Sequence, residues 1–178
     1  MAAEIAKVAL LRGQFTLRSG RTSTYYLDKY LFSTQPRVLD RLGDLFAERI
    51  AALEARIGGR PDRLAGAELG GIPLVTAASL KTGIPCLFVR NAKKDYGTAK
   101  QLEGALERGQ RVVLLEDVAT TGGQALEAVK VLRELGAEVP ALIATIDRLE
   151  GARENVERAG LIFEALFTTR DLGVGGEP

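Results

Sequence analysis

The sequence has 178 residues, a length typical of one domain, and its 24 Lys and Arg balance 23 Asp and Glu to a net charge of +1. This balance predicts no nucleic acid and no anionic membrane as partner. The absence of histidine excludes histidine bases, Ser-His triads and the commonest zinc ligands, and a single cysteine, Cys86, excludes an internal disulfide and fits a core residue better than a nucleophile.

The N-terminal region begins with apolar positions at near-helical spacing, which predict an amphipathic helix over 4–12. It lacks the basic segment and long apolar run of a signal peptide, and no stretch approaches the roughly 18 apolar residues of a membrane span. We therefore expect a cytoplasmic protein. Residues 14–28 carry a Ser-Gly pair between two β-prone pieces, which predicts a hairpin-like loop.

The remaining chain alternates between helical and strand patterns. Short, continuously apolar strands separated by helices indicate an α/β fold with a mainly parallel sheet covered by helices on both faces. No internal repeat interrupts the pattern, so one domain is expected over 1–178. The predicted helices cover 36–53, 72–83, 122–138 and 154–160, and the predicted strands cover 62–69, 85–90, 111–118, 139–148 and 161–167.

The segment 112–124, VVLLEDVATTGGQ, carries the clearest chemistry. Its apolar strand delivers Glu116 and Asp117 toward the carboxyl edge of the sheet, where ligands bind in open α/β folds. The small-residue turn then opens a helix, whose free backbone N–H groups form an anion cradle. Carboxylates bind sugar hydroxyls or magnesium, and the cradle binds phosphate, so a phosphorylated ribose fits both.

The same segment has a plainer interpretation, a strand–turn–helix with solvated acids and a threonine N-cap. It is neither a Walker loop nor a dinucleotide-binding fingerprint, because the Gly-Lys-Ser/Thr and G-x-G-x-x-G patterns are missing. A second segment, 89–104, is polar and holds Arg90, Lys93, Lys94 and Lys100. It is either a solvated basic loop or a cationic clamp over an anionic leaving group.

Segment 112–124 resembles the phosphoribosyl pyrophosphate (PRPP) signature of the type I phosphoribosyltransferases: an apolar strand, two acids, two intervening residues and a Thr- and Gly-rich turn. The resemblance implies that Glu116 and Asp117 engage the ribose hydroxyls and that residues 119–123 hold the 5′-phosphate. ELGGIPL, 68–74, resembles the family's pyrophosphate loop. The PRPP-binding residues implied are Gly70, Gly71, Arg90, Lys94, Tyr96, Glu116, Asp117, Ala119, Thr120, Thr121, Gly122 and Gly123.

Three further segments resemble one branch of that family, the orotate phosphoribosyltransferases. Segment 89–104 resembles the catalytic loop, in which Arg90 and Lys94 would act on the leaving pyrophosphate together with the acids Glu116 and Asp117. Segment 15–28 resembles the hood that covers the base, with Arg18 where the family has a lysine, and IDRLEG, 146–151, resembles the segment that pairs with the orotate carboxylate. The orotate-binding residues implied are Arg18, Tyr25, Tyr26, Thr120 and Arg148.

The resemblance implies the type I phosphoribosyltransferase fold, with a hood from roughly 1–35 plus part of the C-terminus and a core over roughly 36–160. It implies a homodimer with shared active sites that joins orotate to PRPP, giving orotidine 5′-monophosphate and pyrophosphate in pyrimidine biosynthesis. Magnesium would be held mainly through PRPP, with Asp117 as a candidate protein ligand. Two alternatives stay open: a phosphoribosyltransferase for another nucleobase, and a non-catalytic PRPP-sensing regulator.

Overall fold

The computed structural model describes residues 1–16, 22–90 and 101–174. A two-stranded hairpin and a six-stranded sheet make up its β-structure in these ranges, and helices surround the larger sheet. The helices are α1 (Ala2–Ala9), α2 (Lys29–Ser33), α3 (Pro36–Leu53), α4 (Gly71–Thr82), α5 (Gly123–Glu134) and α6 (Ala152–Arg158). The strands are β1 (Leu10–Thr16), β2 (Thr22–Leu27), β3 (Arg63–Ala67), β4 (Cys86–Val89), β5 (Leu102–Glu103), β6 (Arg111–Ala119), β7 (Glu138–Asp147) and β8 (Ile162–Thr168).

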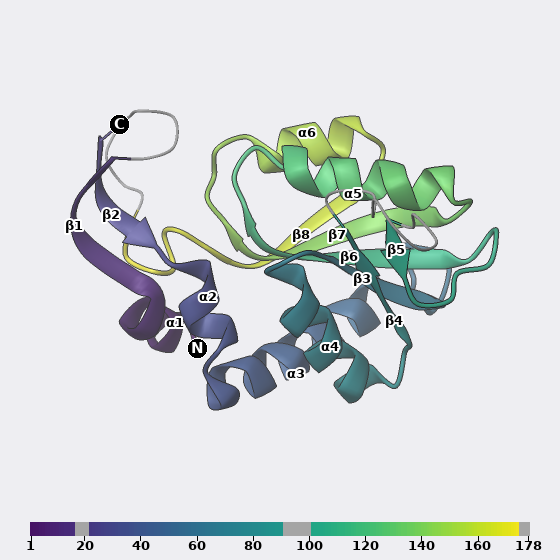
Figure 1. Ribbon diagram of the computed structural model, residues 1–178, viewed down its shortest axis with the longest axis horizontal. Helices are drawn as coiled ribbons and strands as arrows, with labels where there is room; N and C mark the ends of the chain where they lie inside the picture. The colour runs from purple at the N-terminus through teal and green to yellow at the C-terminus, as the bar shows by residue number, and fades with distance from the viewer. Residues whose placement is uncertain (17–21, 91–100, 175–178) are drawn as a thin grey trace.

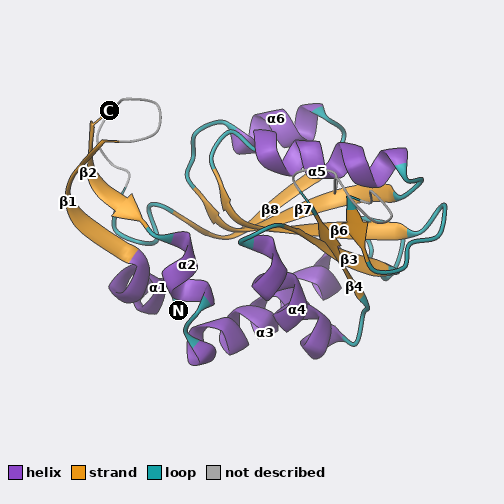
Figure 2. Ribbon diagram, viewed as in Figure 1, coloured by secondary structure: helices purple, strands orange, loops and turns teal. Residues whose placement is uncertain are grey.

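The larger sheet has the strand order β5-β4-β3-β6-β7-β8. All its pairings are parallel except that of β4 with the two-residue edge strand β5. Helices α3 and α4 cover one face of the sheet, and α5 and α6 cover the other (Figures 1 and 2). The predicted α/β fold with a mainly parallel, helix-covered sheet is therefore confirmed.

A hydrophobic cluster lies on each face of the larger sheet, which explains why the sequences of its central strands are unbroken apolar runs. Val113 and Leu115 of β6 belong to the cluster beneath α3 and α4, whereas Val112 and Leu114 belong to the cluster beneath α5. All four side chains are fully buried. Successive strand residues point to opposite faces, so a strand buried on both sides has no polar alternation.

A smaller lobe, the hood, packs beside the carboxyl end of the sheet (Figure 1). It consists of α1, the antiparallel hairpin β1–β2 and α2, and the segment 169–174 after β8 returns to it. Ile5 of α1, Phe32 of α2 and Leu172 share the cluster that also contains the residues beneath α3 and α4. The hood is thus joined to the core by apolar packing as well as by the chain itself.

Four sequence-based elements were missed or differ from the structure by more than two residues, and one of them is the helix predicted over 122–138, which ends at Glu134. The helix predicted over 4–12 ends at Ala9, because Leu10 pairs with Leu27 and continues into the hairpin. Helix α2 was not predicted, although Asp28 caps it by accepting a 3.1 Å hydrogen bond from the Tyr30 backbone. Strand β5 was taken as loop, because a two-residue strand carries no readable periodicity.

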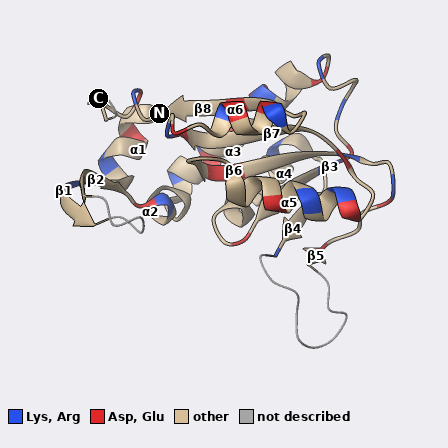
Figure 3. Ribbon diagram, turned by 90° about the horizontal axis from the view of Figure 1, so that it is seen from above, with Lys and Arg blue, Asp and Glu red and all other residues tan. Residues whose placement is uncertain are grey.

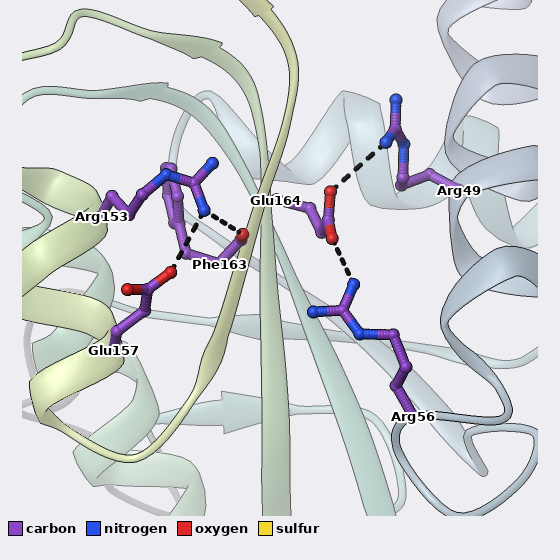
Figure 4. Close-up of polar contacts among 6 residues, drawn as sticks. All are labelled: Arg49, Arg56, Arg153, Glu157, Phe163 and Glu164. Atoms are coloured by element: carbon purple, nitrogen blue, oxygen red, sulfur yellow. Dashed lines mark hydrogen bonds and ion pairs between the residues drawn. The ribbon is translucent and has the colours of Figure 1, made fainter.

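Strand β8 is the last strand of the sheet, and arginines anchor it from both sides (Figure 4). Glu164 forms ion pairs with Arg49 at 3.3 Å and Arg56 at 2.5 Å, both from the α3 side. On the other face, Arg153 of α6 donates to the Phe163 carbonyl at 3.1 Å. The bond from Arg153 occupies one backbone acceptor of this edge strand, and the Glu164 ion pairs tie its side chain to the α3 side.

Charges of both signs are mixed along α5 and α6 in the view of Figure 3, in keeping with the near-neutral sequence. None of the helices in the described ranges is long and apolar enough to cross a membrane.

Candidate active site

The acidic pair Glu116–Asp117 lies inside the last third of β6, two residues before the strand ends. Both side chains are buried, with Glu116 6% and Asp117 1% exposed. Their carboxylates fold back on the strand: Glu116 Oε1 accepts from the Asp117 backbone N–H at 3.2 Å, and Asp117 Oδ1 accepts from the Val118 N–H at 2.6 Å. Two adjacent buried acids are costly unless something compensates them, which makes the pair a candidate functional site.

Asp117 is held between a glycine and a lysine. A Cβ placed on Gly70 would lie 1.5 Å from Oδ2 of Asp117, so the carboxylate rests directly against the backbone of the loop between β3 and α4. On its other side, Lys29 of α2 brings Nζ to 3.0 Å from Oδ2 and donates a 3.3 Å hydrogen bond to Oδ1. The next glycine, Gly71, packs against the backbone of Gly66 and Leu115.

Burial and neighbouring charges shift the pKa values of Glu116 and Lys29. Burial raises the pKa of Glu116 well above its usual range, and the neighbouring Asp117 carboxylate raises it further. Burial by itself would lower the pKa of Lys29 and is the largest single effect, but the charge and hydrogen bond of Asp117 together with the charge of Glu116 outweigh it, so the net shift of the pKa is upward. The lysine is therefore firmly cationic beside the acidic pair.

The turn after β6 has the features of a phosphate cradle. Thr120 is half-buried and Thr121 exposed, and Gly122 has the left-handed φ of +78°, which favours glycine. Helix α5 begins at Gly123 with no side-chain cap, so its first backbone N–H groups are free to bind an anion. Asn155 of α6 donates to the Thr121 carbonyl at 2.9 Å and braces the turn.

Arg148 follows β7 and faces the hood. Its backbone N–H donates to the carbonyl of buried Ala119 at 2.9 Å, so it sits beside the cradle. Its guanidinium lies 6.0 Å from the Tyr25 ring centroid and pairs with Glu150 through Nη2 at 2.8 Å. Tyr26 points to the opposite side of the hairpin, where it stacks with Phe15 at 5.7 Å. Of the predicted aromatic pair, only Tyr25 is therefore brought to Arg148.

The turn that carries Arg148 is shaped by its neighbours. Asp147 accepts a 2.8 Å hydrogen bond from the Leu149 backbone through Oδ1. Leu149 has a φ of +60°, a left-handed conformation that a leucine adopts only at a cost of about 1 kcal/mol or more. Such strain persists where the surrounding structure imposes it, and it is often found in binding turns.

Arg90 directly follows β4 and lines a hollow with Gln101, Gln124 and Glu127. Gln124 belongs to the first turn of α5, so Arg90 lies on the helix side of the cradle. Its Nη1 is 3.9 Å from Glu103, a loose ion pair. Three predicted site residues, Arg18, Lys94 and Tyr96, lie outside the described residues.

Buried side-chain polar atoms without a hydrogen-bond partner gather at this one place. Within residues 1–16, 22–90 and 101–174 they belong to Arg90, Glu116, Asp117, Thr145 and Arg148. In Asp117 the atom is Oδ2, which has no hydrogen bond but is compensated by the Lys29 ammonium at 3.0 Å. Four of these residues were predicted from the sequence, and the β6–β7 register sets the fifth, Thr145, beside Asp117. Buried polar groups are normally satisfied, so a cluster of unsatisfied ones indicates a ligand site.

Comparison with known proteins identifies the family. Residues 32–164 match the model of the phosphoribosyl transferase domain. An orotate phosphoribosyltransferase of Natronomonas pharaonis is 46% identical over 160 residues, which is 90% of this chain and 87% of that protein. The chain belongs to the orotate phosphoribosyltransferases. The recognition made from the sequence motifs is thereby confirmed.

Solved orotate phosphoribosyltransferases share the fold closely. The Mycobacterium tuberculosis enzyme in complex with Fe(III) dicitrate has a TM-score of 0.85 and 32% identity, with 97% of each chain covered. The same enzyme in complex with PRPP has a TM-score of 0.81 and 31% identity, covering 97% of this chain and 96% of the other. The family assignment therefore extends over the hood as well as the core.

Lys29, Thr145 and Glu150 are the site residues that sequence reasoning missed. Lys29 reaches Asp117 across 88 residues, and no local pattern reports such a contact. Thr145 sits inside a buried strand, where a threonine reads as a β-branched core residue. Only Lys29 had a nearby signal, the helix-capping Asp28 that places it at the start of α2.

Proposed function

We propose that this protein transfers the phosphoribosyl group of PRPP to orotate, giving orotidine 5′-monophosphate and pyrophosphate, in the pyrimidine biosynthesis of the cytoplasm. The observation that carries the proposal is the cluster of unsatisfied buried polar atoms on Arg90, Glu116, Asp117, Thr145 and Arg148. Its cations and carboxylates suit a substrate that has both phosphate groups and sugar hydroxyls. The family membership supports the same reaction.

The charges of the site fit the chemistry of ribosyl transfer. As pyrophosphate leaves C1, the sugar gains positive, oxocarbenium-like character, while negative charge grows on the leaving group. Glu116 and Asp117 would bind the ribose hydroxyls and face the developing cation, and Arg90 and Lys94 would stabilise the departing pyrophosphate. Orotate is an anion through its carboxylate, and the proton on its N1 has to leave as N1 bonds to C1 and pyrophosphate departs. The departing pyrophosphate would accept that proton, so a chain that has no histidine is compatible with the reaction.

The phosphate and the base would bind on either side of this reacting centre. The backbone N–H groups of residues 120–123 would hold the 5′-phosphate at the start of α5. Arg148 would pair with the orotate carboxylate, and Tyr25 would lie against the planar ring. Arg18 would complete the base site from the hood, and Thr120 would contact both substrates.

The residues present fit a magnesium ion held chiefly by the substrate. In the described part of the chain, no group of three or more His, Cys, Asp or Glu could hold a metal. Magnesium usually binds through one or two carboxylates plus substrate phosphates, and Asp117 would supply such a carboxylate oxygen. When bound with PRPP, the ion would neutralise charge on the pyrophosphate.

The proposal includes a two-fold dimer in which Lys94, from the predicted loop 91–103, acts in the partner's site. Residues 102–103 of that predicted loop pair with β4 of their own sheet, so they are not part of the reaching segment. Lys94→Ala and Asp117→Asn chains should each be nearly inactive alone. If Lys94 acts across the dimer, subunit exchange creates one intact site in each mixed dimer. Random pairing makes roughly half the dimers mixed, so about a quarter of the wild-type activity should return. No recovery after proven exchange would rule out the shared site but not the reaction.

Turnover of orotate in the presence of PRPP and magnesium, followed by the ultraviolet absorbance of orotate, tests the reaction. Competition by uracil and purine bases separates it from a phosphoribosyltransferase for another base. PRPP binding with nucleic-acid binding but without pyrophosphate release would favour a regulator. The near-neutral charge and the buried, unsatisfied site groups favour the enzyme.

A further inference from the structure

The ion pair between Lys29 and Asp117 joins the hood to the centre of the candidate site. Lys29 is the first residue of α2, and Asp117 lies in β6 of the core. Nζ of Lys29 is 3.0 Å from Oδ2 and 3.3 Å from Oδ1, so the ammonium faces both carboxylate oxygens. The lysine side chain is 33% exposed and the aspartate 1%, which places the ammonium where the buried acid meets the open side of the site.

Neighbouring groups restrict the positions of the Asp117 carboxylate and of the Lys29 ammonium. The Gly70 backbone closes one side of the carboxylate, because even a Cβ there would lie 1.5 Å from Oδ2. The Val118 backbone N–H donates a 2.6 Å hydrogen bond to Oδ1. The ammonium of Lys29 also lies 5.6 Å from the Tyr30 ring, a favourable cation–π distance. The contacts with Gly70, Val118 and Lys29 therefore hold the Asp117 carboxylate on three sides.

The pair also answers an electrostatic problem of the proposed reaction. Glu116 and Asp117 are adjacent, buried carboxylates, and PRPP is strongly anionic, so the acids would repel the substrate they have to bind. A cation held against Asp117 offsets that repulsion without removing the oxygen atoms needed by the ribose hydroxyls. It also keeps the carboxylate from rotating away from the reacting centre.

We propose that Lys29 is a positioning residue, which holds the Asp117 carboxylate in its reactive orientation and couples the seating of the hood to the ribose site. This inference rests on the proposed phosphoribosyl transfer. It adds a role for a residue of the hood helix that belongs neither to the predicted orotate-binding residues nor to the acidic pair.

Two substitutions at Lys29 and one control test the role. Lys29→Gln keeps a polar side chain but removes the charge, and it should lower kcat by at least about tenfold while changing KM for PRPP by less than about threefold. Lys29→Arg should restore most of that loss. The control is Lys81→Gln, which also removes an ion-paired lysine, here bound to Asp40 and Asp44 at 2.8 Å on the surface, and it should leave kcat unchanged.

A merely structural role would give a different result. If Lys29→Gln lowers the melting temperature but keeps kcat within about twofold of the wild type, the positioning role is wrong. The double variant with Asp117→Asn provides the second criterion. If Lys29 acts through Asp117, it should lose little more activity than Asp117→Asn alone, whereas multiplied losses would overturn the inference.

Four of these proteins distinguish a failure of this inference from a failure of the proposed function: the wild type, Lys29→Gln, Asp117→Asn and the double variant. A wild-type chain that does not turn over orotate would refute the proposed function. The coupling can then still be measured without substrate, as the non-additivity of the melting-temperature losses in Lys29→Gln, Asp117→Asn and the double variant. Additive losses would show that the two residues are not coupled in solution.

Discussion

Replacing Gly70 by alanine should disable the site through a single contact. A Cβ at this position would lie 1.5 Å from Oδ2, 2.5 Å from Cγ and 3.2 Å from Cβ of Asp117. Because Cβ atoms almost never approach other heavy atoms closer than 3.0 Å, the carboxylate or the loop has to move by about 1.5 Å. The backbone at Gly70 has φ −70° and ψ −28°, which alanine adopts freely, so the conflict is purely steric.

The displacement predicts two measurable losses. Overpacking of this kind costs about 1 to 3 kcal/mol of unfolding free energy, measurable by urea denaturation. Moving the Asp117 carboxylate by more than 1 Å should lower orotate turnover by about a hundredfold or more. The absorbance assay for orotate measures this loss directly.

The decisive control places the same substitution in an Asp117→Ala background. Of the three atoms nearest to the added Cβ, only the Asp117 Cβ at 3.2 Å remains in that background, so Gly70→Ala should cost less than about 1 kcal/mol. If the stability losses of Gly70→Ala and Asp117→Ala simply add, the clash lies elsewhere and the reasoning is refuted.

Three further predictions concern the charges around the site. Arg148→Ala should raise KM for orotate much more than KM for PRPP, and equal effects on both would make the residue structural. Glu150→Gln should lower KM for orotate, because it frees the guanidinium from its 2.8 Å ion pair, and a raised KM would contradict this. Glu116→Gln should raise the unfolding free energy at pH 7 by about 1 kcal/mol while lowering activity. The pKa of Glu116 is higher in the folded protein than in the unfolded chain, so its ionisation destabilises the fold only at a pH above the pKa of the unfolded chain. The stability gained by Glu116→Gln should therefore disappear when the pH falls below that pKa.

The parts of the molecule that follow local rules could be predicted. Helix α3 has the predicted bounds 36–53, because its apolar positions and the proline at its start act within the helix itself. The acidic pair and the small-residue turn were found because they are contiguous in sequence. The family resemblance also singled out Arg148, which the structure places beside Tyr25 of the hood.

The parts that depend on distant contacts could not be predicted. Residues 10–12 are extended because they pair with 25–27, although their own pattern continues a helix. The opposite orientation of Tyr25 and Tyr26 follows from the strand period once β2 is known, whereas the sequence predicted a hairpin-like loop without the bounds of its strands. The contact of Lys29 with Asp117 needs the packing of α2 against the sheet edge, which no short segment encodes.

The apolar cluster shared by Ile5 and Leu172 has a consequence for protein synthesis. Ile5 leaves the ribosome long before Leu172 is made. The apolar contact that Leu172 provides to the cluster of α1 is therefore still missing while β3 to β8 emerge. The nascent chain can therefore assemble its sheet and its acidic pair before the lobe that seats Lys29 is complete. We expect catalytic competence to appear late, after the segment 169–174 has been released, and a chain stalled before it should expose α1 to chaperones.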